Sequence, residues 1–298
     1  MDYAIICDQL TRQFGDTTAV DRLDLRVRKG EVFGFLGPNG AGKTTTLRML
    51  NGVLGASDGQ ANVLGYDIAA QPAEIRQRTG VLTETPSVYE SLTARQNLHF
   101  FGELYGVATD ILSKRANSLL DEFGLAERAD DRVGEYSKGM RQRLALARTL
   151  LHQPALLFFD EPTSGLDPAA ARMVNDLIQT LSRRAGRTIF LCTHNLAEAQ
   201  RLCDRIGIID HGVLKAMGSP SQLAHDIWQT VKIDINLRVK PTPAVREAIQ
   251  RVCESCDEQG DGHLVVELKD ENLTPDVVAA IVSAGGRIYE VTPVERDL

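Results

Sequence analysis

The chain has 298 residues, 43% of them hydrophobic and 24% charged, which is enough to bury a core in one large domain or in a large and a small one. Acidic residues outnumber basic ones and give a formal net charge of −7, so we expect no basic surface for nucleic acid and predict no nucleic-acid partner. The opening segment MDYAIICDQL lacks the basic start of a secretory signal, and no apolar run approaches the ~20 residues that span a membrane.

Short strand-like runs alternate with helical stretches from the start of the chain to about residue 218. Several of these runs are continuously apolar, which is typical of strands covered on both faces. The run AARMVNDLIQTLSRRAG (170–186) has helical periodicity and stops at a glycine. The pattern predicts an α/β domain with a largely parallel central sheet. The predicted strands are AIICDQL (4–10), LDLRVRKG (23–30), EVFGFLG (31–37), ALLFFD (155–160) and TIFLCTH (188–194).

The segment GPNGAGKTT (37–45) matches the phosphate-loop pattern G-x-x-x-x-G-K-[ST]. A predicted strand precedes it and a helical run follows. A glycine-rich turn that arose by chance would not need this context, so the context favours a phosphate loop. Glycines let backbone N–H groups converge on phosphates at a helix N-terminus. Lys43 would neutralise the β- and γ-phosphates, and Thr44 would coordinate Mg²⁺. The predicted nucleotide-binding residues are Gly37, Pro38, Asn39, Gly40, Ala41, Gly42, Lys43, Thr44 and Thr45.

Polar side chains follow two of the predicted buried strands. Asp160 and Glu161 end ALLFFDE, and His194 ends TIFLCTH. Ligands of such sheets gather at the carboxyl ends of the strands. Asp160 is therefore predicted to hold Mg²⁺, Glu161 to orient or deprotonate the attacking water, and His194 to contact the γ-phosphate. An acidic helix cap and a structural histidine are the alternatives, and they are favoured for each feature taken alone.

Two further segments are candidates for nucleotide contacts. Phe14, in RQFGD, would stack on an adenine ring if it is exposed, and would otherwise be an ordinary core aromatic. In GEYSKGMRQR (134–143), a small polar turn around Ser137 runs into a basic helical stretch. By itself that turn is an ordinary capped helix start.

In this order, the motifs over residues 3 to about 218 resemble the nucleotide-binding subunit of an ATP-binding cassette (ABC) transporter. GPNGAGKTT is similar to its Walker A motif, LLFFDE (156–161) to Walker B, SGLD (164–167) to the D-loop, and His194 to the switch histidine. YSKGM (136–140) resembles the signature motif in the form found in exporters of the ABC-2 type, including drug and antibiotic exporters. The implied fold is a P-loop NTPase cassette with a mostly parallel central sheet, an antiparallel β subdomain and a helical subdomain.

The resemblance implies an ATPase with ATP and Mg²⁺ as cofactors. It also implies a second subunit, most simply a homodimer packed head to tail, in which Ser137 and Gly139 grip the γ-phosphate of the partner's nucleotide. A separate polytopic permease would carry the substrate, with this chain peripheral at the cytoplasmic face of the membrane. The alternative is a soluble ABC ATPase acting on ribosomes or nucleic acid, which usually has tandem cassettes or basic extensions.

The sequence departs from the family pattern at two motifs. Lys138 and Met140 replace a glycine and a glutamine of the signature. Glu84, in GVLTETPSVYESLT, stands where the Q-loop usually has glutamine. A carboxylate there would either add a ligand to Mg²⁺ or repel the γ-phosphate, and we include Glu84 among the nucleotide and metal ligands.

The composition changes near residue 218. GSPSQL (218–223) is turn-rich and predicts the start of a linker, so we expect an ATPase domain over 1–222 and an accessory domain over 229–298. The second domain is predicted to be a small α+β unit of βαββαβ type that resembles the domain appended to many ABC-2 ATPases. It carries a C-x-x-C, Cys253 to Cys256, for which a coincidental spacing is favoured over a redox or metal site. A ligand sensor, a dimer brace and a cover for a sheet edge remain open roles.

Overall fold

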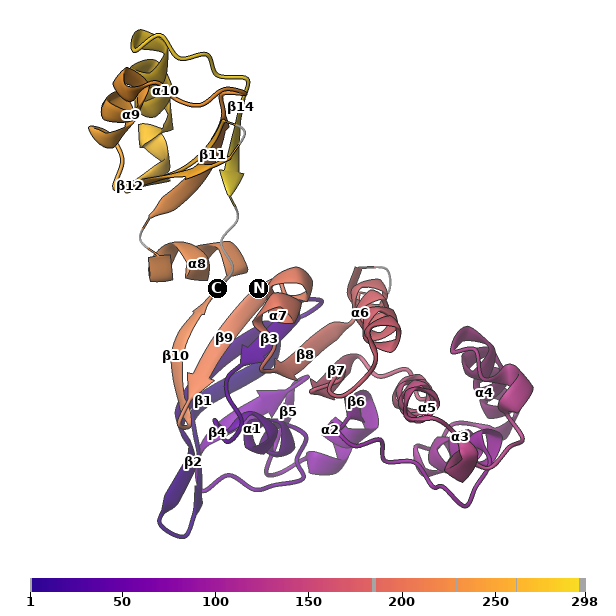
Figure 1. Ribbon diagram of the computed structural model, residues 1–298. Helices are drawn as coiled ribbons and strands as arrows, with labels where there is room; N and C mark the ends of the chain where they lie inside the picture. The colour runs from indigo at the N-terminus through magenta and orange to yellow at the C-terminus, as the bar shows by residue number, and fades with distance from the viewer. Residues whose placement is uncertain (1, 184–185, 229, 261, 295–298) are drawn as a thin grey trace. The chain divides into compact units, whose positions relative to one another are not determined.

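The computed structural model describes residues 2–183, 186–228, 230–260 and 262–294 (Figure 1). The chain divides into two compact units, Met1–Ser219 and Pro220–Leu298. No helix among the residues described is long and apolar enough to cross a membrane.

A six-stranded sheet forms the centre of the first unit. Its strand order is β10-β9-β3-β8-β7-β6, and all neighbours are parallel except β9 and β10. Every residue of β3, β7 and β8 is buried, as their unbroken apolar runs predict. The strands are β3 (Val32–Leu36), β6 (Thr79–Leu82), β7 (Leu156–Asp160), β8 (Thr188–Thr193), β9 (Arg205–Asp210) and β10 (Val213–Gly218).

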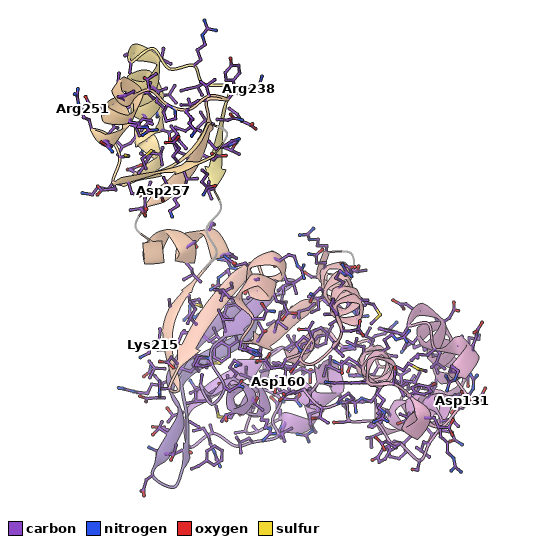
Figure 2. The ribbon with its side chains drawn as sticks, in the orientation of Figure 1. Asp131, Asp160, Lys215, Arg238, Arg251 and Asp257 are labelled. Atoms are coloured by element: carbon purple, nitrogen blue, oxygen red, sulfur yellow. The ribbon has the colours of Figure 1, made fainter. Side chains whose placement is uncertain are left out.

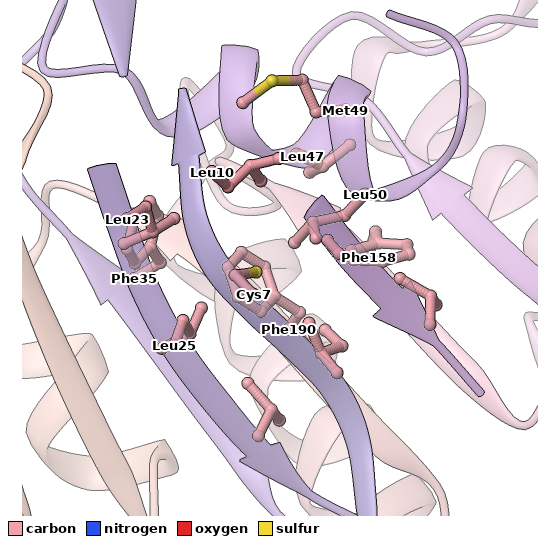
Figure 3. Packing of buried hydrophobic residues seen from close by; sticks show 14 of the residues in the cluster. Cys7, Leu10, Leu23, Leu25, Phe35, Leu47, Met49, Leu50, Phe158 and Phe190 are labelled. Atoms are coloured by element: carbon pink, nitrogen blue, oxygen red, sulfur yellow. The ribbon is translucent and has the colours of Figure 1, made fainter. Parts of the chain in front are cut away.

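A four-stranded antiparallel sheet, in the order β2-β1-β4-β5, packs against the central one. Buried and exposed residues alternate along β2, so only one face of this sheet joins the core. Figure 3 shows Leu23 and Leu25 of this sheet packed with Phe35 and Phe190 of the central sheet and with Leu47 of α1. The strands are β1 (Tyr3–Phe14), β2 (Thr17–Arg28), β4 (Asp58–Val63) and β5 (Tyr66–Asp67).

Helices complete the first unit. Figure 1 shows α3, α4 and α5 side by side as a helical group, and they contact one another. Thr93 begins α3 with a reciprocal capping box that includes Gln96. The mostly parallel sheet, antiparallel sheet and helical group confirm the predicted fold class. The helices are α1 (Lys43–Leu50), α2 (Pro72–Arg78), α3 (Ala94–Leu104), α4 (Thr109–Glu122), α5 (Lys138–Leu150), α6 (Pro168–Arg183) and α7 (Leu196–Leu202), with short 3-10 turns at Ala126–Arg128 and Val133–Glu135.

The second unit is a four-stranded antiparallel sheet, β12-β13-β11-β14, with helices α9 and α10. Its element order is βαββαβ, and alternate residues of β11 and β13, such as Ile235 and Val266, form its core with Ile249 and Ile281 of the helices. The elements are β11 (Val231–Asn236), α9 (Pro243–Gln250), β12 (Ser255–Gln259), β13 (His263–Leu268), a 3-10 turn (Glu271–Leu273), α10 (Thr274–Ser283) and β14 (Glu290–Val294).

The segment expected to begin a linker instead leads into a helix. GSPSQL enters α8 (Pro220–Trp228), which lies in the second unit. Pro220 is its first residue, a position that suits proline because the first N–H groups of a helix have no partner within it. The turn-rich composition therefore marks the start of a helix as well as the end of the first unit.

Candidate active site

A cavity opens beside the phosphate loop, at the carboxyl ends of β3 and β7. It brings together residues that lie far apart in the sequence, since Glu84, Asp160 and Glu161 line it with Ala19. Figure 2 labels Asp160 within the first unit. The phosphate-loop residues that line it are Pro38, Asn39, Gly40, Gly42, Lys43, Thr44 and Thr45.

The loop needs glycine at two of its positions for steric reasons. Gly42 has φ +109°, in the left-handed region, and a Cβ there would lie 2.4 Å from the carbonyl oxygen of Ala19. A Cβ on Gly37 would lie 2.2 Å from the carbonyl oxygen of Ile209. Helix α1 then starts with no side-chain cap and no acidic residue in its first turn. Its N-terminal N–H groups and dipole are thus available to an anion.

Lys43 lies inside the loop and is only 6% exposed. Its Nζ donates to the carbonyl oxygens of Gly37 at 2.5 Å and of Pro38 at 3.1 Å. The same Nζ lies 3.3 Å from Oε1 of Glu161. The ammonium group therefore sits where phosphate oxygens would approach the loop, with one carboxylate as its counter-ion.

The next residue, Thr44, connects the loop to the end of β7. Its Oγ1 donates to Oδ2 of Asp160 at 2.8 Å. Burial raises the pKa of Asp160, and the charges of Glu161 and Glu84 raise it further, while the Thr44 hydrogen bond and Lys43 oppose the rise. Oδ1 of Asp160 is a buried oxygen that accepts no hydrogen bond among the described residues, and Oε1 of Glu161 has only its ion pair with Lys43. A hydroxyl and carboxylates with free lone pairs fit Mg²⁺, which prefers such oxygen ligands.

Glu161 has a strained backbone. Its φ is +50°, a conformation that costs a non-glycine residue ~1–3 kcal/mol and needs support from its surroundings. Its N–H donates to the carbonyl oxygen of Cys192 at 2.9 Å. Its Oε2 lies 2.9 Å from Nδ1 of His194, whose side chain is 56% exposed. The carboxylate of Glu161 is thereby held between the buried Lys43 and the accessible His194.

Ser137 and Gly139 line a different cavity. Ser137 caps α5 by accepting a hydrogen bond from the N–H of Met140 at 3.3 Å. Their cavity is also lined by Gly165 and Asp167 of the segment similar to the D-loop. It shares no lining residue with the cavity around Lys43. Within one chain, the structure does not bring these two predicted nucleotide contacts to the phosphate loop.

Phe14 lies at the end of β1 and is 47% exposed. The guanidinium carbon of Arg12 lies 4.4 Å from its ring centroid. Phe14 does not line the cavity that contains Lys43. Of the two alternatives for Phe14, this exposure is the one that stacking requires, while adenine contact itself stays a prediction.

Sequence reasoning missed two buried polar residues near the site. Gln142, in α5, donates from Nε2 to the carbonyl oxygen of Pro162 at 2.8 Å. Glu198, in α7, accepts hydrogen bonds from Thr163 and Thr193. For Glu198, the one signal in the sequence is Asn195 three residues earlier, which is a good N-cap. An N-cap indicates the start of a helix and nothing about the role of Glu198.

Similar sequences and structures exist for most of the chain. The family model described as ABC transporter matches residues 20–164. The daunorubicin/doxorubicin resistance ATP-binding protein DrrA of Streptomyces peucetius is 42% identical over 245 residues, which cover 82% of this chain and 73% of that protein. The daunorubicin resistance ATP-binding protein DrrA2 of Streptomyces coeruleorubidus is 39% identical over 296 residues, 99% of this chain and 87% of that protein. A solved structure described as the ATP binding subunit of an ABC transporter has a TM-score of 0.69 and 30% identity, and the match covers 75% of this chain and 93% of that one.

Proposed function

This chain belongs to the ABC transporter family as an ATP-hydrolysing, ATP-binding subunit of the drug-exporter type, and on that basis we propose that it powers export through a transmembrane permease on a separate chain. The observation that supports this proposal most is the cavity in which Lys43, Thr44, Asp160 and Glu161 converge. Two relatives are named for daunorubicin resistance, which supports a drug or antibiotic as the exported substrate.

In this proposal the loop and its lysine bind the ATP phosphates. Thr44 and Asp160 hold Mg²⁺, and Glu84, which lines the same cavity, is a further oxygen ligand. Mg²⁺ neutralises phosphate charge when it is bound. Glu161 orients the attacking water and accepts its proton, and the contact of His194 with its Oε2 keeps that carboxylate in place.

The separate cavity at Ser137 supports a head-to-tail pair of chains. The N-terminus of α5 has no acidic residue in its first turn, so its N–H groups favour an anion such as a γ-phosphate. Because that cavity and the phosphate loop have no lining residue in common, we propose that Ser137 and Gly139 contact ATP bound to the partner. The simplest such partner is a second copy of this chain.

Exposed apolar side chains on helix α3 and on the loop before it support docking of a permease. Leu104 is 70% exposed, and Tyr89 and Phe100 are also exposed. The rings of Tyr89 and Phe100 meet edge to face, with centroids 5.1 Å apart. Tyr89 follows Glu84 by five residues in the loop that leads to α3. A permease segment on this surface would contact the loop that connects to Glu84 and would place the chain, as a peripheral subunit, at the cytoplasmic face of the membrane.

The test is to look for a polytopic membrane protein in the neighbouring reading frames and to co-express it with this chain, followed by pull-down in detergent and an ATPase assay. We expect co-purification, and we expect Leu104→Asp to abolish it because a carboxylate would be buried at the contact. Val53→Asp, at an exposed valine of the same unit, is the matched control and should still co-purify. A functional ATPase that associates with ribosomes or nucleic acid and not with the membrane protein would support the alternative function.

A further inference from the structure

Helix α7 contains a buried carboxylate that has no role in the proposed chemistry. Glu198 is only 3% exposed. Its Oε1 accepts a hydrogen bond from Oγ1 of Thr163 at 2.9 Å, and its Oε2 accepts one from Oγ1 of Thr193 at 3.0 Å. Its own N–H donates to Oδ1 of Asn195 at 3.1 Å, and the N–H of Asn195 donates to Oγ1 of Thr193 at 3.0 Å. Glu198, Thr193 and Asn195 thus form a closed ring of hydrogen bonds, to which Thr163 is joined by one more.

The two threonines belong to different segments of the site. Thr163 lies two residues after Glu161 in the turn that follows β7, and Thr193 is the last residue of β8, directly before His194. A single carboxylate thus joins the turn that carries Glu161 to the strand end that carries His194. These are the two side chains whose atoms lie 2.9 Å apart at the site.

The turn after β7 needs such support because of its backbone. Glu161 has φ +50°, and residues in this region keep that conformation only where neighbouring contacts enforce it. Three further hydrogen bonds hold the turn: Glu161 N–H to the carbonyl oxygen of Cys192, Ser164 N–H to that of Glu161, and Gln142 Nε2 to that of Pro162. The bond from Thr163 to Glu198 adds a side-chain link between the turn and the end of β8, beside the backbone bond from Glu161 to Cys192.

We propose that Glu198 is a positioning residue for ATP hydrolysis, which fixes Glu161 and His194 relative to each other through Thr163 and Thr193. Without the carboxylate, the buried hydroxyl of Thr193 and the partly exposed hydroxyl of Thr163 lose their acceptor. The turn is then joined to the strand end by backbone contacts alone, which leaves the side chains of Glu161 and His194 less firmly fixed. Displacement of a catalytic group by about 1 Å can cost 10²-fold in rate. The phosphate loop meets this network through the backbone alone, where the N–H of Gly37 donates to the carbonyl oxygen of Thr193 at 3.4 Å. That bond does not use the Glu198 carboxylate, so we expect ATP binding to survive its removal. This inference rests on the proposed ATPase function.

The test compares Glu198→Ala with a control at another buried glutamate. Glu31 is also buried, accepts from the N–H of Arg28 and pairs with Arg205, but it lies at the opposite end of β3 from the phosphate loop. We expect Glu198→Ala to lower kcat by about 10-fold or more while KM and the Kd for ATP stay within about twofold. Glu31→Ala should lower the melting temperature and leave kcat per folded molecule unchanged.

A second variant serves if Glu198→Ala does not fold. Thr163→Val removes only one hydrogen bond at a partly exposed position, and we expect a three- to tenfold lower kcat at an unchanged KM, roughly the effect of one lost orienting contact. Where both single variants fold, Glu198→Ala should cost less in the Thr163→Val background than in the wild type, because the two act through one contact.

The outcomes separate this inference from the function on which it rests. A wild-type chain with no ATPase activity contradicts the proposed function. Wild-type hydrolysis together with an unchanged kcat in Glu198→Ala, or in Thr163→Val where it is the variant that folds, overturns the positioning role alone. So does a Glu198→Ala variant in which KM rises as much as kcat falls, because a loss of that kind belongs to nucleotide binding.

Discussion

The chain has two helix N-termini that suit phosphate, and they are built differently. Helix α1 begins at Gly42, in the left-handed region and without a side-chain cap, beside a loop that encloses the buried Lys43. Helix α5 begins at Ser137, whose side chain caps it, beside an open cavity that Gly165 and Asp167 also line. Neither helix has an acidic residue in its first turn, so both present the positive end of a helix dipole.

The difference lies in what surrounds each N-terminus. At α1 the same chain supplies a lysine, a threonine and three carboxylates, which are the parts that phosphate binding, metal binding and water activation need. At α5 the acidic residue that lines the cavity is Asp167, and its Oδ1 already accepts the N–H groups of Ala169 and Ala170. The α5 cavity thus offers donors and lacks a base and metal ligands. In the proposed head-to-tail pair it would be half of a site, completed by a nucleotide bound to the partner chain.

The largest expected effect tests whether the residues around α1 bind and hydrolyse ATP as proposed. Lys43→Ala removes the ammonium group from the loop and leaves the buried Glu161 without its counter-ion. We expect ATP turnover to fall by on the order of 10²-fold or more, because charge stabilisation in the transition state is lost. The measurement is steady-state phosphate release by the purified chain, with the exposed Lys29→Ala variant as the control for loss of a positive charge. Turnover within a few-fold of wild type would contradict the assignment of Lys43.

The part of the α1 cavity that the sequence can predict is the part whose contacts are local. The loop, its lysine and the start of α1 fall within nine consecutive residues, and the strand-end positions of Asp160, Glu161 and His194 follow from apolar runs. The contacts that complete the site join segments more than a hundred residues apart, as in the bond between Thr44 and Asp160. Neither that bond nor the left-handed backbone of Glu161 leaves a local pattern in the sequence.

The α5 side could be predicted only by resemblance. A serine before a basic helix indicates a cap and nothing more, and the cavity at Ser137 forms because the turn at Gly165 lies against α5. Glu198 was missed for a similar reason, since its importance comes from two threonines on separate segments. Phe14 is a different case, because the sequence allowed both an exposed stacking position and a core position, and no pattern determined its ligand.

An intermediate effect tests whether the α5 half-site serves another chain. We propose mixing a Lys43→Ala chain with a Ser137→Arg chain, which places bulk and positive charge at the cap. Each mixed dimer then has one site with both defects and one sound site. Random pairing makes half of the dimers mixed, so ATPase activity should recover to at most about a quarter of wild type, and to less if the two sites act together.

The matched control mixes Lys43→Ala with Glu161→Gln, two defects on the α1 side of the site. Every site in those dimers keeps one defect, so no activity should return. Mixed dimers must be shown to form, for example by pull-down through two different affinity tags. If the Ser137→Arg mixture then gives no more than the average of the two single variants, the two-chain site is wrong.

The smallest expected effect is a stability difference of opposite sign at the two cavities. Burial raises the pKa of Asp160 above its ordinary 3.8, so its ionised form is disfavoured by folding, and stability falls as pH rises from about 3.8 through the raised pKa. Hydrogen bonds from the N–H of Ala170 and then of Ala169 lower the pKa of Asp167. The stability that its ionised form contributes is therefore present above its ordinary pKa and is lost as pH falls through the lowered one. Without Mg²⁺ and nucleotide, Asp160→Asn should melt higher than wild type at pH 7 and Asp167→Asn should melt lower.

Thermal melts of both variants in EDTA measure these shifts, which we expect to be on the order of a few degrees or less. The advantage of Asp160→Asn should shrink toward zero as pH approaches about 4, since the wild-type carboxyl is then protonated in the folded state. The deficit of Asp167→Asn should persist at that pH and shrink only below it, and it should be the smaller shift because Asn can still accept the same N–H groups. If both variants changed the melting temperature in the same direction at pH 7, Asp160 and Asp167 would be in similar electrostatic environments. In that case burial would not disfavour the ionised form of Asp160, and the cavity at α1 would have no cost of a buried carboxylate for a metal ion to offset.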